Sequence, residues 1–531
     1  MAAEQGIETD ARQRLSVRSV CGRVLVDAIT SLDHPESQKG FQAFYGSSSE
    51  LCGQSAMSKP SFYWYDLETS GTEPRWDRIV QFAGLRTDMD LNPIDDEYCT
   101  YVRLADDILP SPGAAIVTGI TPQLCQDQGI DEWQALSRVL QIFSQPNTCV
   151  TGFNSLRFDD EFTRFGLYRM LLEPYAREWQ HGNSRWDIID LVRATGALRR
   201  DGIEWPVNED GLPVYNLERM TQANNLEHGQ AHDAMSDVHA TIGLARLIKK
   251  AQPKLFSYYF DLRAKKRSRA LLEPYGARLC LHVSGMYPRE RFGSAPVISI
   301  CRHPTNSNSI VVADLSQEID SLLTWDADAI RERLFKVGAT ERPPLKEVRI
   351  NRAPFLAGIE VLTEENWSRL GYNRKVIEER ARRLRQPAIT AKIARVYRRQ
   401  AQEAAADPEA ALYDAFLQDS DRKRAEALQA QLQEGGWSDL DYDDERLKTL
   451  AERLKARSFP HQLTETERGD WHEFVRSKLH AADAPWRTLT RFRQEIEDER
   501  VKLATTPDPH REQILQALSD HAAHLEAQYA R

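Results

Sequence analysis

Residues 62–71 read FYWYDLETSG, a run of apolar and aromatic residues that ends in a glycine. Its alternation, followed by Gly71, predicts a β-strand that runs into a turn. Because side chains two positions apart on a strand point to the same face, Asp66 and Glu68 should project together. Two carboxylates held close together repel each other, and a bridging cation removes that repulsion. On this segment alone, a solvated acidic pair at a strand end is the simpler explanation.

The segments that follow predict an α/β domain with a mixed sheet flanked by helices, ending near residue 250. Strand patterns come first, then a proline-rich loop at 109–122, and helical spacing dominates afterwards. The predicted strands are 79–88, 97–104 and 148–154, and the predicted helices are 131–144, 158–171, 187–198, 217–224 and 232–250.

The pattern changes at Pro253. Short alternating runs over 276–315 predict a small β-rich unit, with a helix inserted near 326–336, and the chain is almost entirely helical in pattern from about 375. A length of 531 residues also exceeds what one hydrophobic core usually holds. We therefore expect an N-terminal extension, an α/β domain, a β-rich domain and a helical domain, with the bounds 1–58, 62–248, 253–402 and 404–531.

The N-terminal extension shows weak periodicity and no signal-peptide anatomy. Met57 stands directly before the first strongly patterned segment. We expect the working protein to start there, with the upstream piece a leader or a wrongly assigned start.

Composition narrows the class of protein. No run approaches the roughly 18 consecutive apolar residues of a membrane helix. The seven scattered cysteines form no C-x-x-C pair, which indicates reduced thiols in a cytoplasm and makes a cysteine zinc site improbable. The formal net charge of -10, taken as a total, argues against a nucleic-acid partner.

Two further segments place acidic residues where burial should be costly. Asp159 follows the predicted strand that ends in GFN, although Asp160 and Glu161 beside it suit an acidic cluster at a helix N-terminus equally well. His232 and Asp237 are separated by four residues. A helix beginning around Asp233, which could cap it, would put Asp237 in its first turns and His232 on the preceding loop. A lone histidine at a helix start is more often structural.

The order D-x-E, then D, then H-x(4)-D resembles the DEDD exonuclease superfamily, in the subclass with a histidine as fifth residue. The resemblance implies that Asp66, Glu68, Asp159 and Asp237 hold two Mg²⁺ or Mn²⁺ ions, for which oxygen ligands are suited. It also implies that one ion activates a water, that the other stabilises the leaving 3′ oxygen, and that His232 is the general base.

A longer set of segments resembles the bacterial exodeoxyribonuclease I family over about 60–531. The resemblance implies a ribonuclease H-like exonuclease domain, an SH3-like β-rich domain and an α-helical C-terminal domain. It further implies removal of 5′-mononucleotides from the 3′ end of single-stranded DNA, in repair and recombination. The matching segments are 65–88, 110–122, 152–164, 179–194, 208–213 and 282–287.

Arginines and aromatic residues alternate over 157–200, as a groove for a single strand requires. By their place in the matched segments, the expected strand contacts are Arg164, Tyr175, Trp179 and Arg193, with Glu68 at the terminal nucleotide. Tyr175 and Trp179 could instead be a core pair at i, i+4 spacing. The family carries a basic residue at the substrate-contacting position of Asn216, so this departure speaks against a phosphate contact there.

Positive charge is concentrated in two blocks. Residues 246–278 and 374–399 each contain ten Lys/Arg and two Asp/Glu, a local charge of +8. We interpret them as walls of a DNA channel whose closure would allow many cuts per binding event, with solvated helix faces as the alternative.

The family resemblance also implies docking of the acidic C-terminal tail of the single-stranded-DNA-binding protein. Arg199, Tyr258, Arg278 and Arg385 occupy the matching positions, whereas Gly358 and Thr363 differ from the expected pocket. We expect a monomer.

Two rival functions remain. One is an RNA-trimming or proofreading exonuclease of the same fold, although such enzymes are usually short or fused to a polymerase. The other is a non-catalytic protein that binds single-stranded DNA, against which the complete set of five residues argues.

Overall fold

The computed structural model describes residues 59–226, 233–336, 338, 340–398, 405 and 407–530. The expectation that the protein starts at Met57 therefore falls outside the described residues, as does His232.

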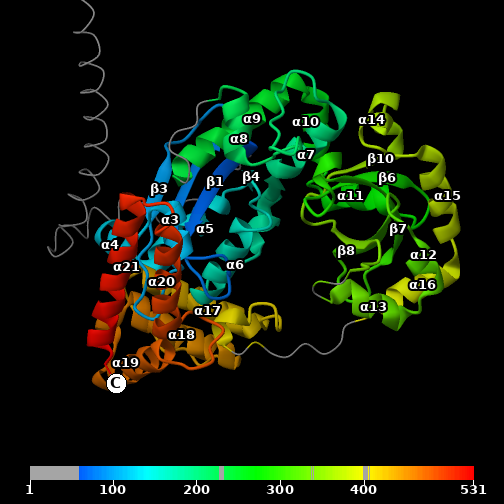
Figure 1. Ribbon diagram of the computed structural model, residues 1–531. Helices are drawn as coiled ribbons and strands as arrows, with labels where there is room; N and C mark the ends of the chain where they lie inside the picture. The colour runs from blue at the N-terminus through cyan, green and yellow to red at the C-terminus, as the bar shows by residue number, and fades with distance from the viewer. Residues whose placement is uncertain are drawn as a thin grey trace, which may run out of the picture. The chain divides into compact units, whose positions relative to one another are not determined.

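A five-stranded mixed sheet organises the first domain (Figure 1). Its strand order is β3-β2-β1-β4-β5, with β1 antiparallel to β2 and parallel to β4. The mixed sheet predicted from the sequence is confirmed, and β5 is a strand that the sequence pattern did not reveal. The strands are β1 (Ser61–Thr69), β2 (Ile79–Thr87), β3 (Tyr98–Tyr101), β4 (Thr148–Gly152) and β5 (Ser184–Asp187).

Strand β1 is buried on both faces. Phe62 and Trp64 join one hydrophobic core, and Tyr63, Tyr65 and Leu67 join another on the opposite face. Successive side chains of a strand point to opposite faces, so β1 contributes to both cores. It is also the middle strand of the sheet, and its polar side chains lie towards its end.

Helices cover both faces of this sheet. Residues of α7 and α9 share the core of Phe62, whereas residues of α5 and α6 share the core of Tyr63. The helices are α3 (Pro112–Thr118), α4 (Pro122–Gln128), α5 (Glu132–Phe143), α6 (Asp159–Arg169), α7 (Ile188–Leu198), α8 (Leu217–Ala223) and α9 (Ala234–Ala251), with short 3₁₀ turns η1 (Ala176–Glu178) and η2 (Gln180–Gly182).

The prediction of a loop over 109–122 is wrong, because this segment contains α3 and the start of α4. Ser111 and Thr121 each accept a backbone N–H as N-caps, and a proline follows each of them at the first helical position. Proline is well tolerated there because the first N–H of a helix has no partner inside the helix.

The second domain is built on an antiparallel sheet with the order β10-β6-β7-β8-β9. The β-rich unit predicted over 276–315 supplies three of these strands, and two later strands complete the sheet. The strands are β6 (Leu279–Val283), β7 (Ser294–Arg302), β8 (Ser309–Asp314), β9 (Leu345–Arg349) and β10 (Leu356–Gly358). Around them lie α10 (Pro253–Asp261), α11 (Lys265–Leu272), η3 (Arg289–Arg291), α12 (Asp320–Thr324), α13 (Ala327–Phe335), η4 (Ile359–Val361), α14 (Glu364–Arg369), α15 (Arg374–Leu384) and α16 (Pro387–Val396).

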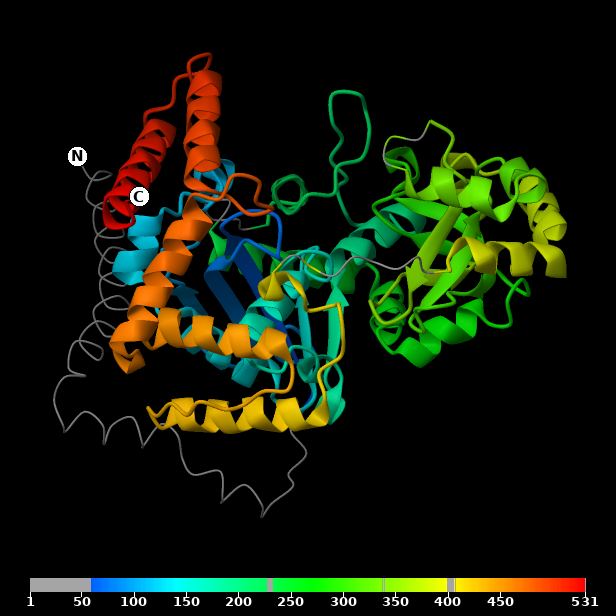
Figure 2. The same cartoon turned by 90° about the horizontal axis from the view of Figure 1, so that it is seen from below.

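The last domain is helical, as predicted, and α20 and α21 lie side by side in it (Figure 2). It is joined to the first domain by buried charges: Asp107 accepts from Arg457 at 2.5 Å and from Lys478 at 2.6 Å. Its elements are η5 (Pro408–Ala410), α17 (Asp419–Gln433), α18 (Glu445–Ser458), η6 (Pro460–Gln462), α19 (Glu465–Leu479), α20 (Leu489–Leu503) and α21 (Pro509–Gln528).

Within the described part of the chain, no helix has both the length and the apolar character needed to cross a bilayer.

Candidate active site

The last residues of β1 extend past the end of the parallel strand β4. Strand β4 pairs with β1 only from Ser61 to Trp64, so the backbone of Asp66 to Glu68 has no strand partner on that side. The Leu67 N–H faces the carboxylate of Asp159 at the start of α6 closely enough to lower the pKa of that carboxyl, although burial raises it more. Asp159 also lies close enough for its charge to raise the pKa of both acidic residues of β1, Asp66 and Glu68.

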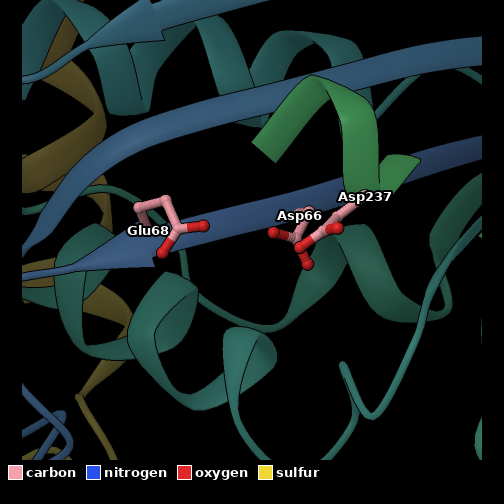
Figure 3. A group of neighbouring side chains, drawn as sticks. All are labelled: Asp66, Glu68 and Asp237. Atoms are coloured by element: carbon pink, nitrogen blue, oxygen red, sulfur yellow. The ribbon is translucent and has the colours of Figure 1, made fainter. Parts of the chain in front are cut away.

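Helix α9 brings a fourth carboxylate to the same place. It packs against β1, with Asp237 in its first turn as predicted. One carboxylate oxygen from each of Asp66, Glu68 and Asp237 lies within 4.8 Å of the others (Figure 3). The structure therefore brings together the four acidic residues that the sequence motifs single out.

Without a bound cation, the negative charges of these carboxylates repel one another and are poorly solvated. Burial and the negative charges of Asp159 and Asp237 raise the pKa of Asp66 well above its ordinary value. Burial, followed by repulsion from Asp237 and Asp159, raises the pKa of Glu68 to about 8. Burial likewise raises the pKa of Asp159 to about 8. With Glu68 only 8% exposed, a solvated pair at a strand end is excluded.

The donor set fits a divalent cation. Carboxylate oxygens are the ligands that Mg²⁺ and Mn²⁺ prefer, and a bound cation would remove the mutual repulsion of these buried groups. The residues that would hold it are Asp66, Glu68, Asp159 and Asp237.

Asp187 is a supporting residue that lies within a matched segment but is not among the site residues expected from the sequence. Its carboxylate accepts the backbone N–H groups of Asn154 at 2.9 Å and Leu156 at 3.1 Å, and it also caps α7 through Ile189. These bonds hold the loop that leads into Asp159. The sequence signal that could have revealed it is an aspartate at the very start of the helix predicted over 187–198, where an N-cap is expected.

Asp160, the neighbour of Asp159, has a different environment. Its carboxylate bonds Arg177 at 2.7 Å and also Arg185. Although burial alone would raise the pKa of Asp160, the charges of Arg185, Arg164 and Arg177 lower it. The three consecutive acidic residues of α6 are therefore not one solvated cluster.

These ion pairs correct the interpretation of 157–200 as a row of positive groups along a groove. Four of its arginines are buried and bound within the protein, so they are not free along an open surface. The four are Arg164, Arg169, Arg177 and Arg185.

The predicted strand contacts differ in exposure. Trp179 is 66% exposed, which excludes the core alternative for this side chain, whereas Tyr175 packs partly against the core. Arg164 lies 5.6 Å from the centre of the Tyr175 ring and is bound to Glu178.

The other two predicted strand contacts are Arg193, in the middle of α7, and Asn216, directly before α8. Arg193 is bound to Asp190 at 2.7 Å, and Asn216 is an exposed residue that precedes α8.

The start of α9 corrects a smaller expectation. Helix α9 begins at Ala234 and Asp233 stands at its N-cap position, but the Asp233 carboxylate makes no capping bond among the described residues. It accepts the hydroxyl of Ser236 at 3.0 Å instead.

Two of the residues expected to dock a peptide contact the edge strand β10 or the turn that follows it, and the other two lie near the start of β6. Tyr258 donates to the Leu356 carbonyl at 2.8 Å, and Arg199 donates to the Val361 carbonyl at 3.3 Å. Arg278 is exposed, and Arg385 is exposed and bonds the carbonyl of Gly276.

Charge pairing reduces the second basic block. Within 374–399, arginines of α15 pair with carboxylates, among them Arg374 with Glu364 and Arg383 with Asp320. The local charge of +8 therefore overstates the field that this region presents to a polyanion.

Known proteins match most of the described chain. Family models match in three places: "Exonuclease" over 63–245, "Exonuclease I SH3-like domain" over 263–399 and "Exonuclease I C-terminal domain" over 406–525. Exodeoxyribonuclease I of Haemophilus influenzae is 42% identical over 79% of this chain and 90% of its own length. The Escherichia coli protein of that name is 40% identical over 78% and 89%.

Solved structures agree with this assignment. The crystal structure of E. coli exonuclease I in complex with a dA16 oligonucleotide has a TM-score of 0.83 at 37% identity, covering 88% of this chain and 100% of that one. A moderately thermophilic exonuclease I from Methylocaldum szegediense has a TM-score of 0.82 at 40% identity, covering 88% and 99%. The chain, with its exonuclease, SH3-like and C-terminal domains, belongs to the exodeoxyribonuclease I family.

Proposed function

We propose that this chain is a 3′→5′ exonuclease that degrades single-stranded DNA to 5′-mononucleotides, in DNA repair and recombination. The observation that carries the proposal is the group of Asp66, Glu68 and Asp237, in which Glu68 is buried and the other two are half-buried, and whose oxygens lie within 4.8 Å of one another, with the charge of Asp159 beside them. Relatives support it: E. coli exonuclease I has been crystallised with dA16 and dT13 oligonucleotides.

In this proposal the four carboxylates hold two Mg²⁺ ions, for which Mn²⁺ may be exchanged. Ions held there would lower the pKa of a bound water and would offset the negative charge that develops on the phosphate and the leaving oxygen. Glu68 also contacts the terminal nucleotide. His232 acts as the general base that orients the water and takes its proton, which suits an imidazole because its ordinary pKa is near neutral.

Strand binding is assigned to the surface beside this site. Trp179 offers an exposed ring on which a base can stack, and stacking tolerates any sequence because every base has a π-face. Tyr175 and Arg193 complete the predicted contact set together with Arg164, which is buried against Glu178 and would have to leave that carboxylate to reach a phosphate. Asn216 offers an amide where relatives would carry a positive charge. The basic blocks at 246–278 and 374–399 are proposed as walls of the DNA channel.

The remaining assignments concern organisation and partners. We propose a monomer with domains at 62–248, 253–402 and 404–531. The C-terminal tail of the single-stranded-DNA-binding protein would dock beside Arg199, Tyr258, Arg278 and Arg385. The described cysteines are all free thiols, which supports a cytoplasmic location.

The test is digestion of end-labelled single-stranded DNA, double-stranded DNA and RNA by the wild type and by Asp237→Ala, with Mg²⁺ and with EDTA. We expect stepwise loss of nucleotides from the 3′ end of single-stranded DNA by the wild type only. Equal digestion of RNA would favour the RNA-trimming alternative. Full activity of Asp237→Ala would refute the metal assignment, and binding without digestion would favour the non-catalytic protein.

A further inference from the structure

The turn that follows strand β1 is closed by its own hydrogen bonds. This β1–β2 turn, residues 70–78, joins β1 directly to β2. At its ends, the Ser70 N–H donates to the Arg78 carbonyl at 2.8 Å, and the Ser70 hydroxyl accepts the Arg78 N–H at 2.9 Å. Within it, the Asp77 carboxylate accepts the N–H of Glu73 at 2.9 Å. The turn therefore has a defined shape on which other parts of the protein can act.

The position of Glu68 depends on this turn. Strand β4 pairs with β1 only as far as Trp64, so Glu68 has a strand partner on the β2 side alone. The pairing of β1 with β2 also shifts register between Glu68 and Thr69, directly before the turn. Because such an irregularity re-aims the side chains beside it, a displacement of the turn would move the Glu68 carboxylate.

Helix α6 is tied to the same turn. Arg169, which is buried, donates to the carbonyl of Pro74 at 2.9 Å. Asp159 stands at the start of this helix. The turn therefore links the strand that carries Glu68 to the helix that carries Asp159.

The C-terminal domain contacts the turn through two consecutive residues. The guanidinium of Arg487 lies 3.3 Å from the Asp77 carboxylate and donates to the Leu109 carbonyl at 3.1 Å. Both side chains of this ion pair are largely buried. The ring of Trp486 lies 5.5 Å from the ring of Trp76, which is also in the turn. Adjacent residues of one domain thus hold adjacent residues of the turn.

Both of these residues are fixed within the C-terminal domain. Glu495 of α20 accepts from the Nε of Arg487 at 2.6 Å, and the indole N–H of Trp486 donates to the Lys478 carbonyl at 3.1 Å. Lys478 in turn pairs with Asp107 of the exonuclease domain at 2.6 Å. The contact with the turn is therefore braced from the side of the C-terminal domain.

We propose that Trp486 and Arg487 are positioning residues for Glu68, which act through the β1–β2 turn. This inference rests on the proposed function, in which Glu68 holds a divalent cation. Metal ligands must be held in a productive geometry, and removal of a group that only supports a ligand commonly costs about 10–100-fold in metal affinity or activity. Neither residue has to touch DNA, because its task is to keep the Glu68 carboxylate beside Asp66 and Asp237.

The test uses the full chain and compares Arg487→Ala with Arg491→Ala. Arg491 is a matched control because it also bonds Glu495, at 2.8 Å, from an exposed position on α20. We expect Arg487→Ala to weaken binding of Mn²⁺ alone, measured by calorimetry without DNA, by roughly tenfold, and to lower kcat on single-stranded DNA by a similar factor. Its binding of single-stranded DNA in EDTA should stay at the wild-type value. Arg491→Ala should match the wild type in all three measurements.

Asp77 supplies a second variant from the side of the turn. Asp77→Asn keeps the size of the side chain and removes its charge, so it should reproduce the loss. The double variant with Arg487→Ala should lose no more than either single variant, because both break the same ion pair. Arg487→Lys, which keeps the positive charge beside Asp77, should recover part of the loss. Asp77→Asn and Arg487→Lys decide the question if Arg487→Ala does not fold.

Wild-type affinity of Arg487→Ala for Mn²⁺ would overturn the inference, as would an equal loss in Arg491→Ala or additive losses in the double variant. Weaker DNA binding in EDTA with unchanged Mn²⁺ affinity would make Arg487 a DNA contact instead. Failure of the wild type to digest single-stranded DNA with either metal would refute the proposed function, so the two failures are distinguishable.

Discussion

Asp159 and Asp160 are neighbours in sequence and both are buried, yet they belong to two opposite electrostatic regions. Around Asp159 lie other carboxylates, and burial raises its pKa to about 8. Around Asp160 lie three arginines, which lower its pKa despite the same burial. The comparison teaches that burial of a carboxylate does not by itself identify a binding site. A buried carboxylate that has no arginine or lysine partner does indicate one, because a bound cation must then supply the positive charge.

The largest effect is expected from removing the charge of Asp159, the carboxylate that has other carboxylates around it. Asp159→Asn should lower Mg²⁺-dependent digestion of single-stranded DNA by at least about a hundredfold, because even residues that only support metal ligands cost about 10–100-fold. The metal-free variant should stay folded. Glu97→Gln, at an exposed carboxylate that pairs with His239, is the matched control and should retain activity. Retained activity in Asp159→Asn would remove this residue from the site.

The second-largest effect is expected from removing the charge of Asp160, the carboxylate that is paired with arginines. Asp160→Asn leaves Arg177 and Arg185 without their buried partner, which should lower the free energy of unfolding by about 3–5 kcal/mol. Chemical denaturation of both variants measures the contrast: the Asp160 variant should be destabilised and the metal-free Asp159 variant should not. Equal destabilisation of the two would mean that the comparison has no electrostatic basis.

A smaller effect concerns pH. Because the folded pKa of Glu68, about 8, lies above the ordinary value of 4.5, its stabilising contribution is fully present below about pH 4.5 and is lost as the pH rises through 8. The metal-free wild type should therefore lose more thermal stability between pH 5 and pH 8 than Glu68→Gln does. Added Mg²⁺ should restore the wild type at pH 8. Parallel pH profiles of Tm for the two proteins would contradict the pKa shift.

The smallest effect lies outside both regions, at an exposed ring. Trp179→Ala should weaken binding of single-stranded DNA by roughly tenfold with little change in stability, because the side chain is mostly in solvent. Fluorescence anisotropy at several salt concentrations measures it. The salt slope should remain that of the wild type, since no phosphate contact is lost. A large loss of stability would instead make Trp179 part of the packing.

The sequence by itself determined the order of the domains and the elements that carry Asp66, Glu68 and Asp237. Alternation in FYWYDLETSG specifies a strand buried on both faces, and a period of two places Asp66 and Glu68 on one side of it. Helical spacing likewise put Asp237 in the first turn of α9. These features are local, so residue type and spacing are sufficient to predict them.

Only the tertiary structure decided which charges are available. In the sequence, Arg177 and Arg185 resembled residues of a DNA-binding groove, but the fold buries them against Asp160. Asp187 bonds the backbone of a loop that lies more than thirty residues earlier in the chain. The helices at 112–128 were missed because prolines next to capping side chains resemble a loop. Whether a buried acid has a partner depends on contacts between distant segments, and spacing along the chain does not encode those contacts.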